Sequence, residues 1–328
     1  MKYVNIKKLL LWVAFFILML FVGTQVGNNY YLDFLITVFF MASMASAWNL
    51  VGGYAGLISI GHVAFLGLGA YTSSILFLKL GISPLLGIFL GGGMAMLLAF
   101  LLGILTIRLR GPFFTLSTIA IAEILLLLAT RFVDLTGGSQ GLDIPYKPSL
   151  FNFVFKSYYV YYVIYLVLLA IIISVVTYIN HSKTGCYLKA IREDETAASS
   201  LGVSILKYKM TALLISAFFT GIGGSIYAQY LLFIDPHSVF SVGFSTKVAA
   251  LSIIGGLGTV LGPIVGAFLL TPVEMLLRSQ LGGTYQGLYL LLYGVIMILV
   301  ILIIPRGIVG TLTDVIKNKR KKDADRTK

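Results

Sequence analysis

The sequence predicts an all-α, polytopic membrane protein of about ten transmembrane helices, some of them short or broken, with one short charged helix outside the membrane. Hydrophobic residues make up 59% of its 328 residues and charged residues only 11%, whereas a soluble domain carries about 25% charged residues. The mean hydropathy is +0.98. The apolar residues also gather in runs of about 20 residues, the length that crosses a bilayer as a helix.

Seven apolar runs of spanning length lie before residue 234. They are Leu9–Val26, Tyr31–Val51, Val63–Leu80, Leu85–Ile107, Phe113–Phe132, Tyr158–Ile179 and Met210–Phe233. The first run follows three lysines, as in a signal peptide, but no small-x-small cleavage site comes after it. We therefore expect an uncleaved first span.

The apolar sequence from 239 to 304 is harder to divide, because glycine pairs interrupt it. We divide it into three crossings, the first of them short: Val242–Ile254, Thr259–Leu277 and Tyr285–Ile304. A re-entrant hairpin in place of two of these crossings is the alternative.

The distribution of charge predicts the orientation. With the N-terminus inside, 18 of the 24 Lys and Arg residues fall in cytoplasmic segments, and the connection Val51–His62 is also cytoplasmic. This bias predicts a multi-pass membrane protein with both termini in the cytoplasm. A transmembrane domain over 1–316 is followed by a basic tail over 317–328, interpreted as an anchor on anionic lipid. Because position explains the net charge of +12, no nucleic-acid partner is expected.

A glycine-dense element occurs twice, at 52–65 and at 255–268. Many transporters contain internal repeats whose broken helices meet at the substrate path. The spacings differ by two residues, so a true repeat and a chance resemblance both stay open. The long connection Val133–Ser157 is rich in glycine and proline and predicts a structured outer cap.

A charged island between Gly185 and Gly202 interrupts the lipid-soluble sequence. We predict a short, imperfectly amphipathic helix there, capped by Thr184 and ended by Gly202 in the left-handed conformation. Arg192 and Glu195 lie at i,i+3 spacing and can pair. Five charges among alanines favour a docking helix for another protein over an ordinary solvated loop.

Specific motifs resemble the permease subunit of branched-chain amino acid ABC importers, and among these the M-type. They are 49–62 (NLVGGYAGLISIGH), 111–123 (GPFFTLSTIAIAE), 136–141 (TGGSQG), 189–203 (KAIREDETAASSLGV), 208–209 (YK), 216–228 (SAFFTGIGGSIYA) and 255–263 (GGLGTVLGP). The resemblance runs in order from about 41 to 305. A mild departure is that Cys186 and Tyr187 stand where an Arg often precedes the helix.

The resemblance implies a cytoplasmic coupling helix over Gly185–Gly202 that seats in a groove of an ATPase subunit. It implies as partners a second permease subunit, two ATP-binding cassette subunits and an extracytoplasmic substrate-binding protein. The residues expected to couple to the ATPase are Gly185, Ala190, Arg192, Glu193, Asp194, Glu195, Ala198, Leu201 and Gly202. The substrate it implies is a branched-chain or related hydrophobic amino acid, and urea or another small solute is the alternative within this permease type. The location it implies is a bacterial-type plasma (inner) membrane.

Intramembrane polar residues are the candidates for the substrate pathway. Glu123 reads as a gate or as a strut between helices, and Asn49, Tyr54 and Ser59 flank a glycine-rich break where backbone can line a cavity. Glu274 is expected to pair with Arg278 at i,i+4.

The sequence argues against an enzyme. There is no phosphate-binding Gly-x-x-x-x-Gly-Lys motif, so ATP hydrolysis is expected in partner subunits. One cysteine and three scattered histidines predict neither a metal site nor a catalytic pair, and no cofactor is expected. An ion-coupled secondary transporter remains the less favoured alternative, with Glu123 and Glu274 as its only support.

Overall fold

The structure of the chain is a computed structural model that describes residues 6–109, 111–282, 286–304 and 307–313. Over these ranges the chain is almost entirely helical, which confirms the predicted fold class. The basic tail predicted over 317–328 lies outside the described residues.

The long helices follow the predicted apolar runs. They are α1 (Ile6–Gln25), α2 (Asn29–Asn49), α3 (Val63–Leu80), α4 (Pro84–Thr106), α5 (Pro112–Arg131), α7 (Tyr158–His181), α10 (Ile205–Leu231), α12 (Val242–Gly256), α13 (Gly262–Leu281) and α14 (Gln286–Ile303). Within the described ranges nine segments are long and apolar enough to cross a membrane, and α1 adds a shorter apolar stretch over Trp12–Gln25.

The division of the last third follows the three predicted crossings. The short helix α11 (Pro236–Val239) precedes α12, and together they give a 21-residue apolar segment. Helix α13 has 20 residues, and the last crossing extends through α14. A span needs about 20 residues, so these lengths favour three crossings over a re-entrant hairpin.

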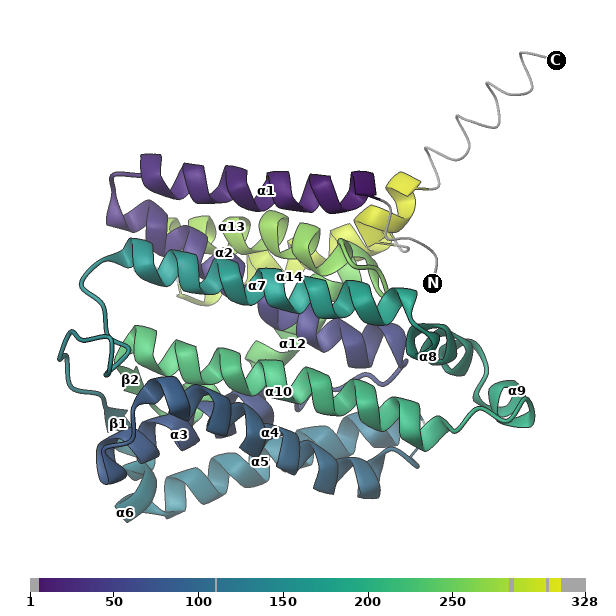
Figure 1. Cartoon of the computed structure of the whole chain (residues 1–328), viewed down its shortest axis with the longest axis horizontal. Coiled ribbons are helices and arrows are strands. Elements are labelled where there is room, and N and C mark those ends of the chain that lie inside the picture. The colour runs from purple at the N-terminus through teal and green to yellow at the C-terminus, as the bar shows by residue number, and fades with distance from the viewer. Residues whose placement is uncertain (1–5, 110, 283–285, 305–306, 314–328) are drawn as a thin grey trace, which may run out of the picture.

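The helices lie side by side along the long axis of the molecule, with the small elements gathered at its two ends (Figure 1). One end carries α6 (Val133–Thr136), η2 (Gly138–Gln140) and the antiparallel pair of β1 (Leu142–Asp143) with β2 (Phe233–Ile234). We call it the β1–β2 end; its ordered elements confirm the structured cap predicted for 133–157. The opposite, α8–α9 end carries α8 (Lys183–Glu193) and α9 (Glu195–Ser200).

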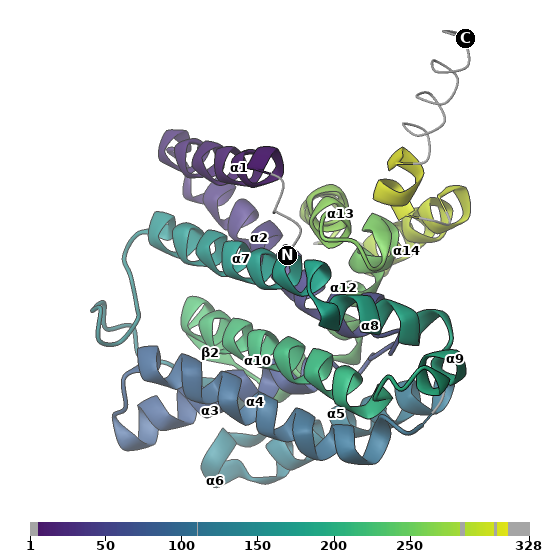
Figure 2. The ribbon, with the colours of Figure 1, turned by 45° about the vertical axis from the view of Figure 1, so that its right-hand side comes forward.

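Small residues let the central helices approach closely. Helix α10 packs against α3 and α4, and α2 packs against α7 and α13. A Cβ added to Gly224 of α10 would stand 2.0 Å from the Leu66 carbonyl oxygen of α3. Because lipid gives little hydrophobic drive between helices, such close contact is what holds them together. Figure 2 shows α13 and α14 on one side of this centre and α3, α4 and α5 on the other.

The helical backbone of α2 continues beyond Asn49. It continues into the π-helical turn η1 (Leu50–Tyr54), and an irregular stretch leads from there to α3. Residues 51–55 are buried, and His62 is 3% exposed, with its Nε2 2.9 Å from the Ser216 Oγ of α10. Most of the predicted connection 51–62 is thus packed within the bundle, where glycine lets the backbone approach closely; that it lies on the cytoplasmic side stays a prediction.

Candidate functional site

The predicted coupling helix is present as two helices, α8 and α9, with a break at Asp194. Asp194 has extended backbone angles (φ −154°, ψ 112°), and its Oδ1 accepts hydrogen bonds from the amides of Thr196 (2.8 Å) and Ala197 (3.0 Å). Its side chain thus satisfies the first amides of α9, as a helix cap does. The prediction of one continuous helix was wrong, because capping by Asp194 begins a second helix.

The ends of this helix pair also differ in part from the prediction. Ser182 caps α8 instead of Thr184, since the Ser182 Oγ accepts from the Gly185 amide. Gly185 must be glycine, because an added Cβ would lie 2.2 Å from the Ile179 carbonyl oxygen. Gly202 has φ +79°, which confirms the predicted left-handed residue.

The predicted coupling residues lie on both faces of the helix pair. Gly185 and Ala198 are buried against the body of the chain, together with Leu188 and Ile191. The exposed coupling residues are Ala190, Arg192, Glu193, Asp194, Leu201 and Gly202, while Glu195 is intermediate. Leu201 is 84% exposed, the largest exposed fraction among the exposed large hydrophobic side chains of the described residues.

Arg192 connects α8 to the glycine-rich break after α2. Its Nη1 donates to the carbonyl oxygen of Gly53 at 2.7 Å, and its Nη2 pairs with Glu193 Oε1 at 3.0 Å. The predicted pairing of Arg192 with Glu195 is wrong. Glu195 instead pairs with Lys209 of α10, which is only 2% exposed, so tertiary packing decides the partner.

The two glycine-dense elements meet at this point. The Asn49 side chain donates from Nδ2 to the Thr259 carbonyl oxygen (2.8 Å) and accepts at Oδ1 from the Gly258 amide (2.9 Å). Gly258 has φ +73°, and a Cβ there would lie 2.4 Å from Arg192 Nη1. We call Asn49, Gly53, Arg192, Gly258 and Thr259 the glycine junction. The sequence indicated both glycine elements but not that Arg192 joins them.

The other predicted pathway residues beside the break are buried near this junction. Lys189 Nζ stands 5.7 Å from the centre of the Tyr54 ring, a cation–π contact. The carbonyl oxygen of Ser59 accepts from Trp48 Nε1 at 2.6 Å. Asn49, Tyr54 and Ser59 do not line the large cavity described below, and their role in a substrate pathway stays a prediction.

Glu123 lies on the exposed face of α5 and makes no hydrogen bond or ion pair with any residue that the structure describes. Among the residues that the structure describes, Glu123 therefore bridges to no other helix. Only Phe114, Ala122 and Ala129 of α5 are buried, so most of this helix faces outward. A role of Glu123 in a gate stays a prediction.

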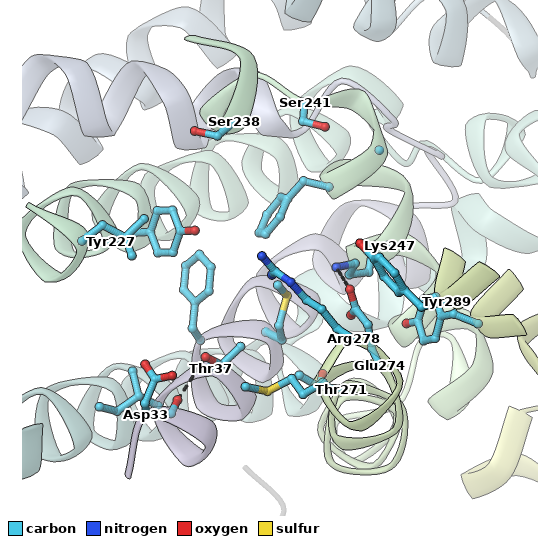
Figure 3. A pocket seen from close by; sticks show the side chains of 18 of the residues that line it. Asp33, Thr37, Tyr227, Ser238, Ser241, Lys247, Thr271, Glu274, Arg278 and Tyr289 are labelled. Carbon is cyan, nitrogen blue, oxygen red and sulfur yellow. Dashed lines mark hydrogen bonds and ion pairs between the residues drawn. The ribbon is translucent and has the colours of Figure 1, made fainter. Parts of the chain in front are cut away.

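A large cavity of about 1260 Å³ lies among α2, α10, α12, α13 and α14, toward the β1–β2 end. The predicted pair of Glu274 with Arg278 is wrong: Glu274 pairs with Lys247 of α12 instead. Figure 3 shows this pair on one side of the cavity and Asp33 on the other, with Arg278 reaching between them. Sequence reasoning missed Asp33 and Lys247, although charges inside membrane spans signal function.

Comparisons with known proteins agree with the resemblance. A family profile described as "Branched-chain amino acid transport system / permease component" matches residues 30–301. Over 283 residues the chain is 28% identical to the "High-affinity branched-chain amino acid transport system permease protein LivM" of Escherichia coli (strain K12), covering 79% of this chain and 65% of that protein. It thus spans about two thirds of the length of this relative.

Two further relatives are matched over more of their length. The "High-affinity branched-chain amino acid transport system permease protein LivH" of the same strain is 24% identical over 317 residues, 90% of this chain and 96% of that protein. The "Probable branched-chain amino acid transport permease protein LivM" of Methanocaldococcus jannaschii is 23% identical over 305 residues, 80% and 88%. No solved structure matches significantly. Since the profile covers both glycine elements and α8–α9, the chain belongs to the family of branched-chain amino acid transport system permease components.

Proposed function

We propose that this chain is the transmembrane permease subunit of an ATP-driven importer for branched-chain or related hydrophobic amino acids. In that role it forms the translocation path with a second permease subunit. Two ATP-binding subunits hydrolyse the ATP, and a substrate-binding protein delivers the amino acid from outside. The family supports this proposal, because it comprises permease components of branched-chain amino acid transport systems.

The observation that carries the proposal is the link from an exposed helix pair to the core of the bundle. The α8–α9 pair presents Leu201 outward, which suits an apolar contact with a partner subunit. On its inner side, Arg192 bonds the backbone of Gly53. A force on α8 therefore acts directly on the glycine junction, where the two broken elements of the membrane domain touch.

The proposal needs the α8–α9 end in the cytoplasm and the β1–β2 end outside, as the positive-inside rule predicts. Single cysteines at Ser199 and Ser139, each in a Cys186→Ser background, report this with an impermeant thiol reagent on intact cells. We expect labelling at Ser139 alone. Labelling of Ser199 from outside would place α8 and α9 beyond the reach of an ATPase.

Transport by the assembled complex in proteoliposomes tests the function itself. We expect uptake of leucine that requires enclosed ATP and survives a protonophore. Uptake that continues without ATP but stops with the protonophore would mean an ion-coupled transporter. ATP-driven uptake of urea without uptake of leucine, isoleucine or valine would mean a related permease with another substrate.

Leu201→Asp tests the docking surface. Because Leu201 is 84% exposed, the substitution should leave the permease folded while weakening its co-purification with the ATP-binding subunits. The matched control is Leu150→Asp, a leucine 74% exposed in the loop at the opposite end, which should co-purify as wild type. Equal retention of the ATP-binding subunits by both variants would contradict docking at α9.

A further inference from the structure

The cavity toward the β1–β2 end holds a balanced set of charges. Its ionised side chains are two acids, Asp33 and Glu274, and two bases, Lys247 and Arg278. Exposed residues such as Tyr30 and Leu290 line its rim, so the cavity reaches the surface. Equal numbers of acids and bases suit a ligand that itself carries one charge of each sign.

Two of these four charged side chains, Asp33 and Arg278, make no ion pair among the described residues. Lys247 and Glu274 pair together, whereas Arg278 forms no ion pair with any described acid. Asp33 accepts a hydrogen bond from the Tyr230 hydroxyl and has no basic partner within the same ranges. Figure 3 shows the Arg278 side chain extending from α13 into the cavity, and Asp33 on the facing helix α2. A carboxylate can therefore bind Arg278 while an ammonium group binds Asp33.

Below the charges the wall becomes aromatic. Phe40 lies seven residues, about two turns, after Asp33, so both side chains lie on the same face of α2. Its ring stacks on Tyr227 (4.7 Å between centroids, 5° between planes) and also meets Tyr165 and Phe244. All four rings line the cavity. These four rings form an aromatic floor, which suits an aliphatic side chain and carries no charged group.

Three hydroxyls on the cavity wall are buried without a hydrogen-bond partner among the described residues. They belong to Tyr165, Thr271 and Tyr293, which are 0%, 1% and 6% exposed. Buried polar groups usually have a hydrogen-bond partner. A hydroxyl without one at the wall of a cavity therefore points to a polar ligand or to water bound with it. With about 1260 Å³, the cavity exceeds the common range of small-molecule sites, so a free amino acid fits with its hydration.

We propose that this cavity is a transient binding site for a zwitterionic α-amino acid with an apolar side chain. Arg278 receives the carboxylate, Asp33 receives the ammonium group, and the aromatic floor around Phe40 receives the side chain. The site deepens the proposed function and rests on it, because the cavity would take the amino acid as it enters the permease. A transport site must release its ligand, so the binding is weak.

Cysteine protection measures this binding without relying on transport. Ser241 lines the cavity, and Ser241→Cys in a Cys186→Ser background places a reactive thiol there. In the purified complex, leucine at about 10 mM should slow alkylation of this cysteine, as a millimolar site requires. Leucinamide, which lacks the carboxylate, and 4-methylpentanoate, which lacks the ammonium group, should protect less. Protection by leucine should be lost in Arg278→Gln and in Asp33→Asn.

Uptake provides the second readout. Arg278→Gln should lower ATP-driven leucine uptake by about tenfold or more, the effect of losing a charged hydrogen-bond partner. Binding of the ATP-binding subunits should be unchanged. Arg131→Gln is the matched control, because Arg131 ends α5 outside the cavity; its uptake should equal that of wild type.

These two experiments can contradict the binding site without contradicting the proposed transport function. A wild-type complex that takes up leucine with ATP, yet shows neither leucine protection of the cysteine nor an effect of Arg278→Gln, would overturn the site and leave the proposed function standing. Equal protection by leucine and by both analogues would also overturn it, because the two charges would then not recognise the ligand. A wild-type complex without ATP-driven uptake of any branched-chain amino acid would overturn both.

Discussion

The two ends of the bundle are packed in opposite ways. At the α8–α9 end, the glycine junction brings backbone to backbone, and a Cβ at Gly53 would stand 2.5 Å from the Gly258 amide nitrogen. Toward the β1–β2 end, five helices stand apart around a cavity of about 1260 Å³ lined by aromatic, aliphatic and polar side chains. One end is closed by contact between backbones, and the other leaves a space among its side chains.

This difference suits a transporter that receives energy at one end and substrate at the other. Packed interfaces without slack move as units, so a shift of α8 is passed on instead of being absorbed. Transporters commonly place such broken elements where two halves of the fold rock against each other. Substitutions at the glycine junction and along α8 and α9 test how rigidly this end is packed.

Gly53→Ala should cause the largest loss of stability. The added Cβ would meet Asn49 Oδ1 at 1.9 Å as well as the Gly258 nitrogen, and overpacking of this kind costs about 1–3 kcal/mol. We expect a lower midpoint of thermal unfolding for the purified complex and loss of uptake. The control is Gly93→Ala on α4, where no atom lies within 4 Å of the added Cβ. Equal midpoints for the two variants would show that the junction has slack.

Glu195→Gln should have the next largest effect. It leaves the Lys209 ammonium group, 2% exposed, without an opposite charge, while Glu195 itself is 36% exposed. The partial exposure of the pair brings the expected cost to about 1–3 kcal/mol, below that of a fully buried pair. Lys209→Met combined with Glu195→Gln should recover most of the unfolding midpoint. A double variant no more stable than Glu195→Gln would contradict a cost that arises from an unpaired buried charge.

Arg192→Gln should reduce coupling more than stability. It removes the hydrogen bond to the Gly53 carbonyl, and losing a charged donor of this kind corresponds to roughly tenfold in uptake per ATP hydrolysed. Lys207→Gln, an exposed substitution at the start of α10, is the control. An unchanged ratio of uptake to ATP hydrolysis in Arg192→Gln would mean that force from α8 reaches the membrane domain by another route.

The transmembrane helices were predictable because the thickness of the bilayer sets their length. Helix α3 begins and ends at the predicted residues, and α5 and α7 differ from prediction by one or two. The break at Asp194 was also within reach of the sequence, since aspartate followed by Glu-Thr-Ala is a strong helix start. That signal was outweighed by the expectation of one continuous amphipathic stripe.

The contacts of the candidate site could not be predicted from local pattern. Asn49 and Gly258 are more than two hundred residues apart, and only the packing of α2 against α12 brings them together. Helical spacing predicted that Arg192 pairs with Glu195 and Glu274 with Arg278. In the structure Arg192 pairs with Glu193, and Glu274 pairs with Lys247. Sequence spacing identifies which charges can meet along one helix, but a neighbouring helix can offer a nearer or better shielded partner.

The weakest expected effect concerns the other hydrogen bond of Arg192, to Glu193. This pair is exposed, with 33% and 76% of the two side chains accessible, so Glu193→Gln should change the free energy of unfolding by less than about 0.5 kcal/mol. The small change should also shrink as salt is added, because exposed charges are screened. Thermal unfolding of the complex at low and high salt measures both. If Glu193→Gln lowered the midpoint as much as Arg192→Gln, the contribution of Arg192 would come from the surface pair. The inward bond to Gly53 would then no longer explain how α8 and the glycine junction are joined.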